Sequence, residues 1–323
     1  MNRRSKLNHY FYGIGTIGRD AVYTMVSMYL MFYMTNVLKV DNLTLGYITA
    51  VITGTKVFDA VNDPFMGVIV DNTHSKWGKF KPWILIGALL SSVFTVLMFT
   101  DFKLTGPAFV VIFLISYLLW EISFTANDIA YWSMLPSLSQ NQKEREKIGA
   151  VARICANLGM FAMVIFITPL TQALGNLFGS WQQGYFVLAI IAVSVMLVFQ
   201  FVMLVFVKER DVITEKQATT HFSDLFKVIF KNDQLLWIII AMALFMIGYT
   251  TTTSFGQYYF TYVYGDVNQY SSFALVLGIA QITSLVLFPK VSKHFLRKKV
   301  YFFASVLVFL GYVIFFFSPT STM

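Results

Sequence analysis

The sequence is poor in charged residues and in cysteine, and each shortage excludes a class of protein. Only 12% of the 323 residues are charged, about half of the roughly 25% that a soluble domain carries. The one cysteine, Cys155, lies inside an apolar stretch, which excludes a disulfide framework, a paired-thiol redox motif and a cysteine-based zinc site. The four histidines are scattered in or beside loops without metal-ligand spacing. A soluble fold is therefore excluded, and metal catalysis has no support.

The sequence is rich in long apolar stretches. Hydrophobic residues make up 57% of the sequence, aromatic residues 17%, and the mean hydropathy is +0.66. Nine stretches are each long enough to cross a hydrocarbon core, which takes about 20 helical residues. We therefore expect an all-α polytopic membrane protein embedded in a lipid bilayer. The predicted spans are 12–38, 45–70, 83–101, 107–137, 146–172, 184–207, 235–263, 270–290 and 299–318.

Basic residues gather in alternate loops. The N-terminus and four loops on the same predicted side hold nineteen of the 24 Lys and Arg residues, whereas the opposite loops hold only Lys39 and Lys103. By the positive-inside rule, the N-terminus is predicted to be cytoplasmic. The net charge of +8 then reflects orientation in the membrane, and we expect no nucleic-acid partner. The basic loops are 71–82, 140–147, 208–233 and 290–299.

The longest polar stretch, residues 208–234, follows the sixth predicted span and mixes charges of both signs. We interpret it as a cytoplasmic linker between an N-terminal six-helix bundle, 1–207, and a partial C-terminal bundle of three helices, 235–323. The loops after the second and the eighth spans are both basic and both precede a third span. Such a repeat is typical of secondary transporters.

Eight charged residues remain inside the predicted spans, where each costs about 2.5–3.5 kcal/mol on insertion scales. With a rise of about 1.5 Å per residue, four helices deliver charge to one layer of the membrane. Among these residues the acids outnumber the bases, so that some carboxylates stay unpaired even if every base forms an ion pair. We therefore favour a functional role for this layer of charges. The eight residues are Arg19, Asp20, Lys56, Asp59, Asp63, Glu121, Asp128 and Arg153.

Two of these acids lie one helical turn apart. Asp59 and Asp63 share a stripe with Lys56 at spacing i, i+3 and i+7. Neighbouring carboxylates repel in a low dielectric unless a cation or a proton lies between them. Oxygen donors suit a small hard cation, so Asn62 and the Thr125 hydroxyl join Asp59 and Asp63 as candidate ligands. The ion would be sodium or lithium, with a proton as the alternative, and no other cofactor is expected.

A second stripe, on the fourth span, combines Glu121, Thr125, Asp128 and Trp132. Carboxylate and guanidinium groups hydrogen-bond sugar hydroxyls, and an indole face packs on the apolar side of a pyranose. Asp128 beside Trp132 and Arg153 therefore fits sugar binding.

The alternative interpretation of these charges is structural. Lys56 would pair with Asp59, and Arg153 with Asp128, to hold helices together. Glu121 is interpreted as a pore-mouth or structural residue.

Gly13, Gly15 and Gly18 match the dinucleotide fingerprint G-x-G-x-x-G. That motif needs a preceding strand and a βαβ unit, whereas here it opens a membrane helix, where small residues allow close helix contacts. We therefore interpret the match as spurious.

Distinct motifs cover nearly all of the chain: 15–20, 58–64 with Gly67, 77–83, 128–132, Arg145 with Glu146, Arg153, and 231–235. Together they resemble the motifs of the glycoside-pentoside-hexuronide:cation symporters, a family of the major facilitator superfamily. The resemblance implies a major-facilitator fold of twelve spans that works by alternating access and carries a sugar together with sodium, lithium or a proton. It places Asp59, Asn62, Asp63 and Thr125 at the cation site. It places Arg19, Asp20, Asp128, Trp132 and Arg153 in the N-terminal half of the sugar site.

Two features depart from that family. Lys56 stands where the resemblance implies an arginine, which keeps the charge but not the bidentate geometry. Nine spans are also fewer than twelve, so we expect a chain truncated at the C-terminus, without the lysine that the eleventh span contributes in the family.

The leading hypothesis is a sugar:cation symporter of a bacterial inner (plasma) membrane, and the alternative is a non-transporting fragment of such a carrier. An enzyme is not expected, because no nucleophile, metal or cofactor motif is present. A channel is not favoured, because the acids lie in one layer.

Overall fold

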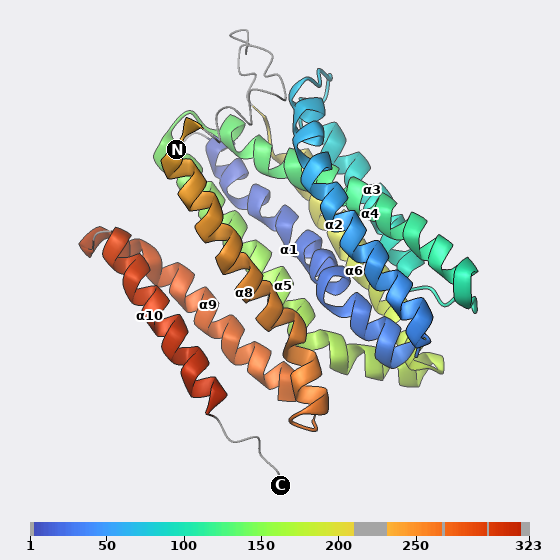
Figure 1. Ribbon diagram of the computed structural model, residues 1–323. Helices are drawn as coiled ribbons and strands as arrows, with labels where there is room; N and C mark the ends of the chain where they lie inside the picture. Colours follow the sequence, from blue (N-terminus) through green and yellow to red (C-terminus); the bar gives the residue numbers. More distant parts are fainter. Residues whose placement is uncertain (1–2, 210–230, 267–268, 296, 318–323) are drawn as a thin grey trace. The chain divides into compact units, whose positions relative to one another are not determined.

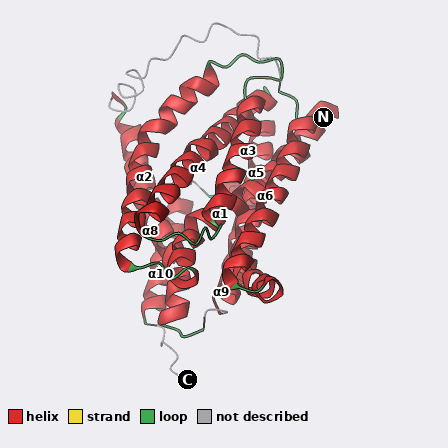
Figure 2. Cartoon of the chain, turned by 90° about the vertical axis from the view of Figure 1, so that its right-hand side faces the viewer, coloured by secondary structure: helices red, strands yellow, loops and turns green. Residues whose placement is uncertain are grey.

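The computed structural model describes residues 3–209, 231–266, 269–295 and 297–317 (Figure 1). Within these ranges the chain forms nine α-helices and no strand (Figure 2). It divides into two compact units, Met1–Ser254 and Phe255–Met323, with the boundary inside α8. The helices are α1 (Arg3–Phe32, followed by a π-helical turn, Tyr33–Val37), α2 (Asn42–Asp71), α3 (Lys81–Met98), α4 (Gly106–Met134), α5 (Gln142–Phe178), α6 (Trp181–Phe206), α8 (Asp233–Tyr262), α9 (Gln269–His294) and α10 (Arg297–Phe316).

Each predicted span corresponds to one of these helices, so the all-α class is confirmed. In the described part of the chain, seven helices are long and apolar enough to cross a membrane by length and composition alone. Helices α1 and α2 are outside that set, and they carry five of the eight charges predicted to lie within the membrane. Most of the predicted linker, residues 210–230, lies outside the described residues, and the predicted division into domains stays a prediction.

Glycines let α1 approach α5 and α6 closely. A Cβ on Gly18 would overlap the backbone of Met196 in α6, and a Cβ on Gly159 in α5 would overlap the carbonyl of Ile17. The glycines of the apparent nucleotide motif therefore serve helix packing, as predicted. Because Arg19 follows Gly18 directly, this tight contact also fixes where the Arg19 side chain begins.

Buried polar contacts hold α4 against its neighbours. The side chains of Asn127 and Gln200 exchange hydrogen bonds of 2.8 and 3.1 Å, and Asn127 also donates to the carbonyl of Ile84 at 2.7 Å. The Tyr12 hydroxyl donates to the carbonyl of Tyr131 at 2.7 Å, while the Tyr131 hydroxyl donates to the carbonyl of Tyr12. Their rings stack with centroids 4.4 Å apart. Buried polar groups keep such geometry because losing a partner is costly, so the rotation of α4 is fixed relative to α1, α3 and α6.

The carboxylate of Glu209, just after α6, lies at the first turn of α3. It accepts hydrogen bonds from the backbone N–H groups of Lys79 at 2.9 Å and Lys81 at 3.2 Å. Gly78 has φ +106°, and a Cβ there would lie 2.6 Å from the Glu209 carboxylate. Both the backbone conformation and the space therefore require glycine at this position. The Lys79 side chain pairs with Asp71 at 2.9 Å, so the loop between α2 and α3 is tied at both ends.

Helix α2 begins at an N-cap on the other side of the bundle. The backbone N–H of Thr44 donates to the Asp41 carboxylate at 3.0 Å. This hydrogen bond stabilises the ionised form and lowers the pKa of Asp41. The cap sets the start of the helix that carries Lys56, Asp59 and Asp63.

Aromatic contacts hold the second unit together. The ring of Tyr270 in α9 lies 5.9 Å from that of Phe260 in α8, and a Cβ on Gly256 would lie 2.8 Å from the Tyr270 ring. Tyr259 contacts Phe315 of α10 at 5.2 Å between centroids. The end of α8 is thereby joined to both α9 and α10.

Candidate functional site

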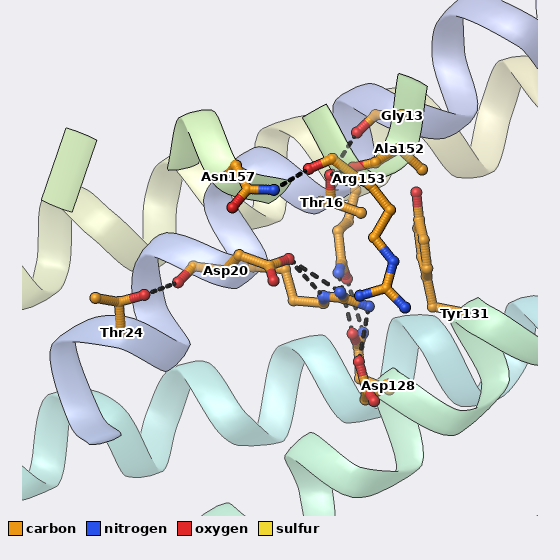
Figure 3. Close-up of polar contacts among 12 residues, drawn as sticks. Gly13, Thr16, Asp20, Thr24, Asp128, Tyr131, Ala152, Arg153 and Asn157 are labelled. Carbon is orange, nitrogen blue, oxygen red and sulfur yellow. Dashed lines mark hydrogen bonds and ion pairs between the residues drawn. The ribbon is translucent and has the colours of Figure 1, made fainter. Parts of the chain in front are cut away.

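Arg19 of α1 lies at the centre of the first group of charges, which we call the arginine cluster: Arg19, Asp20, Asp128, Trp132 and Arg153. The Arg19 side chain is 2% exposed. Its Nη2 and Nε donate to Oδ2 of Asp20 at 2.9 and 3.2 Å. Its Nη1 lies 3.0 Å from Oδ1 of Asp128, an ion pair without hydrogen-bond geometry. In Figure 3 the side chains of Asp20 and Asp128 approach from α1 and α4 respectively. One planar guanidinium thus holds two carboxylates.

Aromatic rings line the same guanidinium groups. The Cζ of Arg19 lies 4.7 Å from the centroid of the Tyr131 ring and 5.4 Å from that of Trp132, while the Cζ of Arg153 lies 4.6 Å from Trp132. These are cation-π distances, and tryptophan is the strongest partner for them. Trp132 therefore contacts both arginines, and it is oriented by α4 on one side of the cluster.

The structural alternative for Arg153 is wrong. Asp128 is paired with Arg19, and in the described ranges no carboxylate lies within ion-pair distance of Arg153. The physical reason is position: Arg19 is buried at the contact of α1 with its neighbours, whereas the exposed Arg153 side chain lies against the indole of Trp132. Asn157 donates to the backbone carbonyl of Arg153 at 2.8 Å (Figure 3). The Arg153 guanidinium and the 41% exposed Asp128 side chain are therefore accessible to a ligand.

The second group, which we call the lysine cluster, contains Lys56, Asp59, Asn62 and Asp63 of α2 with Glu121 and Thr125 of α4. Lys56 Nζ lies 2.5 Å from Oε1 of Glu121 and 3.4 Å from Oδ2 of Asp59. The Lys56 side chain is 49% exposed, Asp59 15% and Glu121 only 5%. The predicted pairing of Lys56 with Asp59 is present, but the closer partner of Lys56 is Glu121. Glu121 is thus a buried ion-pair partner beside the predicted cation ligands.

Two polar atoms of the lysine cluster have no hydrogen-bond partner in the described part of the chain. Oδ1 of Asp59 and Nδ2 of Asn62 are both buried. A carboxylate oxygen only accepts, so a cation or a proton donor would satisfy it. The Thr125 side chain lies close enough to the carboxylate of Asp63 to interact with it, which places its hydroxyl near the same oxygens. The residues therefore fit a small cation at Asp59 and Asp63, with Thr125 and the amide oxygen of Asn62 as further donors.

No group of three or more His, Cys, Asp and Glu residues that could hold a metal occurs in the described ranges. A cation site here therefore depends on two carboxylates completed by neutral oxygens, a donor set that suits a hard monovalent ion more than a transition metal. Pro64 adds a further feature, because it lies inside α2 and has no N–H to donate to the carbonyl of Ala60.

Helix α4 belongs to both clusters. Thr125, in the lysine cluster, and Asp128, in the arginine cluster, are three residues apart and so lie on neighbouring positions of one helix face. Glu121 lies one turn before Thr125 on the same stripe. The sequence interpretation left Glu121 outside the site, although its i, i+4 spacing to Thr125 was the signal that could have included it.

A bundle of long apolar helices, whose few internal charges gather in two adjoining clusters, is typical of a multi-pass membrane protein. The chain belongs to the family described as MFS/sugar transport protein, whose model matches residues 11–323. This membership confirms the resemblance to the glycoside-pentoside-hexuronide:cation symporters.

Three curated bacterial proteins are similar to the chain over nearly all of its length. The lactose permease of Leuconostoc lactis is 30% identical over 97% of this chain and 51% of its own length. The raffinose carrier protein of Pediococcus pentosaceus is 31% identical over 93% of this chain and 48% of its own. The isoprimeverose transporter of Lactiplantibacillus pentosus is 26% identical over 94% of this chain and 62% of its own. The chain thus spans about half the length of the first two relatives.

Proposed function

We propose that the chain belongs to a secondary active transporter that carries a sugar with a cation by alternating access. The observation that carries the proposal is the sharing of α4 between the two clusters. A cation held by Asp59, Asp63 and Thr125 would lie next to the turn that bears Asp128. Each ligand would then stabilise the arrangement of α4 that the other binds, and such coupling is reciprocal.

The arginine cluster is the proposed N-terminal half of the sugar site. The accessible carboxylate of Asp128 would accept hydrogen bonds from sugar hydroxyls, and the Arg153 guanidinium would donate to them. The indole of Trp132 offers an apolar face to a pyranose ring. Arg19 would contribute indirectly, because its buried guanidinium orients the carboxylates of Asp20 and Asp128. The names of the relatives favour a sugar of the glycoside or oligosaccharide class.

The lysine cluster is the proposed cation site, with sodium, lithium or a proton as the coupling ion. A bound cation would neutralise the repulsion between Asp59 and Asp63, and it would satisfy the buried oxygen of Asp59. Asn62 would contribute its amide oxygen and Thr125 its hydroxyl.

We further propose that the membrane is a bacterial plasma membrane and that the N-terminus is cytoplasmic. Support comes from nineteen basic residues in one set of loops against two in the other, and from the bacterial origin of the relatives.

Sugar binding to the purified full chain, measured with and without each cation, tests the proposal. Labelled lactose, raffinose and isoprimeverose are titrated in sodium, in lithium, and in neither at acidic and neutral pH. We expect at least one sugar to bind and its affinity to rise with one cation. Asp59→Asn should remove the cation dependence, whereas Asp128→Asn should remove sugar binding but leave cation binding.

Lys147→Gln, at an exposed position on α5, is the matched control for the loss of one charge. Sugar binding that is indifferent to sodium, lithium and pH, or an unchanged cation dependence in Asp59→Asn, would contradict the proposal.

A further inference from the structure

Lys56 is shared unequally between two acids on different helices. Its Nζ is 2.5 Å from Glu121 of α4 and 3.4 Å from Asp59 of its own helix. Asp59 is therefore held weakly through Oδ2, and its Oδ1 is buried without a hydrogen-bond partner. The ammonium group of Lys56 and a bound cation would both require the carboxylate of Asp59.

A lysine is well suited to exchange one carboxylate for another. Its charge is compact and sits on a flexible four-carbon stem, unlike the planar fork of arginine. The Lys56 side chain is 49% exposed, so little packing fixes it in one rotamer. A small change in its torsions would transfer Nζ fully to Glu121 and release Asp59.

Glu121 is the reason why such a transfer is favourable. Its side chain is 5% exposed, and a buried carboxylate that lacks a positive partner is strongly destabilising. Glu121 therefore attracts Lys56 whether or not a cation is present. A second positive charge at Asp59 would repel the ammonium group toward Glu121, because like charges at such distances interact strongly in a low dielectric.

We propose that Lys56 is a tethered competitor of the coupling cation at Asp59, and that Glu121 is the residue that holds Lys56 when the cation is bound. This proposal rests on the proposed cation site. Glu121 acts as a positioning residue, since it contacts Lys56 and not the ion. Competition of this kind keeps Asp59 neutralised in the empty site and sets the cation concentration at which the site fills.

The test is a double-mutant cycle on the full chain, read out as the half-saturating concentration of the cation that wild type binds, without sugar. Sodium and lithium are titrated by calorimetry, and protons by potentiometric titration. Lys56→Gln removes the competitor, and we expect half-saturation at about one tenth of the wild-type concentration. Glu121→Gln removes the alternative partner of Lys56, and we expect about a tenfold higher concentration. Lys147→Gln is the control and should match wild type.

The double variant K56Q/E121Q separates the proposal from simple long-range electrostatics. Without Lys56, Glu121 has nothing to hold, so the double variant should bind the cation about as tightly as Lys56→Gln. If the two charges act independently on the ion, their effects add and the double variant returns to wild-type affinity. That result, or a Glu121→Gln variant that binds no more weakly than wild type, would overturn the proposal.

Lys56→Gln leaves Glu121 buried without its partner and so carries the main risk of misfolding. The double variant leaves no unpaired buried charge, and wild type, Glu121→Gln and the double variant are sufficient to decide. If wild type binds neither sodium, lithium nor a coupled proton, the proposed function fails and this inference fails with it. If wild type binds a cation but the cycle is additive, only the competition is refuted.

Discussion

Arg19 and Lys56 each pair with two acids in a charge cluster to which α4 contributes, but their surroundings differ. The Arg19 side chain is 2% exposed, holds Asp20 and Asp128, and lies against two aromatic rings. The Lys56 side chain is 49% exposed and touches two acids at unequal distances.

The difference corresponds to two tasks. A fixed guanidinium orients carboxylates before a ligand arrives, which reduces the ordering that binding requires. A loosely held ammonium leaves a neighbouring acid available for a mobile ion. One cluster is thus organised in advance, and the other retains freedom to exchange partners.

Loss of Arg19 should have the largest effect on stability, because the arginine cluster is built around its buried side chain. Arg19→Gln leaves Asp20 and Asp128 without their buried partner, so we expect a loss of about 3–5 kcal/mol in stability. The measurement is the temperature at which half of the purified chain stays monodisperse after heating, with Lys147→Gln as control. A midpoint equal to that of wild type would show that Arg19 does not hold the cluster.

The arginine cluster can also be loosened without any change of charge. Gly18→Ala inserts a Cβ into the backbone of α6, which forces α1 away and should cost about 1–3 kcal/mol. Gly54→Ala is the matched control, because a Cβ there meets nothing within 4 Å. It should be neutral or stabilise the helix by up to about 1 kcal/mol. Equal thermal midpoints for the two variants would refute close packing at Gly18.

Loss of Lys56 should reduce stability less than loss of Arg19. We expect about 1–3 kcal/mol for Lys56→Gln, because it leaves one buried carboxylate, Glu121, without its partner, whereas Arg19 holds two carboxylates and lies against two aromatic rings. The same heating assay measures it, beside the Arg19→Gln variant. A loss as large as that of Arg19→Gln would mean that the two clusters are equally rigid.

The smallest effect is expected at the aromatic face of the arginine cluster. Trp132→Phe keeps an aromatic ring beside Arg153 but weakens the cation-π contact, so sugar affinity should fall about two- to fivefold. Stability should fall by no more than about 1.5 kcal/mol, because Phe keeps most of the apolar ring that packs against the core. The affinity of the variant is measured by titration with the labelled sugar that wild type binds. A complete loss of binding would mean that Trp132 does more than stack on the sugar.

Much of the fold followed from the sequence, because nine long apolar stretches leave few alternatives to membrane helices. Ends were less accurate: α1 begins at Arg3 instead of residue 12, and α5 continues to Phe178, beyond the predicted 172. These additional turns are polar or lie past Pro169, where hydropathy alone does not mark a helix.

It was also predictable that charges on different helices would come together, but not which of them would pair. Asp128 was within reach of both Arg19 and Arg153 by depth, and the choice depends on how α1 is rotated, which the glycine contacts with α5 and α6 determine. Glu121 was not expected to pair with Lys56, for a similar reason. Its depth differs from that of the other acids, yet the long Lys56 side chain spans the gap between α2 and α4.

The carboxylate of Glu209 accepts hydrogen bonds from the backbone N–H groups of Lys79 and Lys81 at the start of α3. It lies directly against Gly78, where a side chain would not fit. These hydrogen bonds do not depend on the side chains of residues 79 and 81, since every amino acid except proline has the same backbone N–H. Substitution should be free at those two positions as far as this contact is concerned, and forbidden at Gly78 and Glu209. This contact therefore constrains Gly78 and Glu209, whereas the side chains of Lys79 and Lys81 are constrained only by their own contacts with Asp71 and the Leu204 carbonyl.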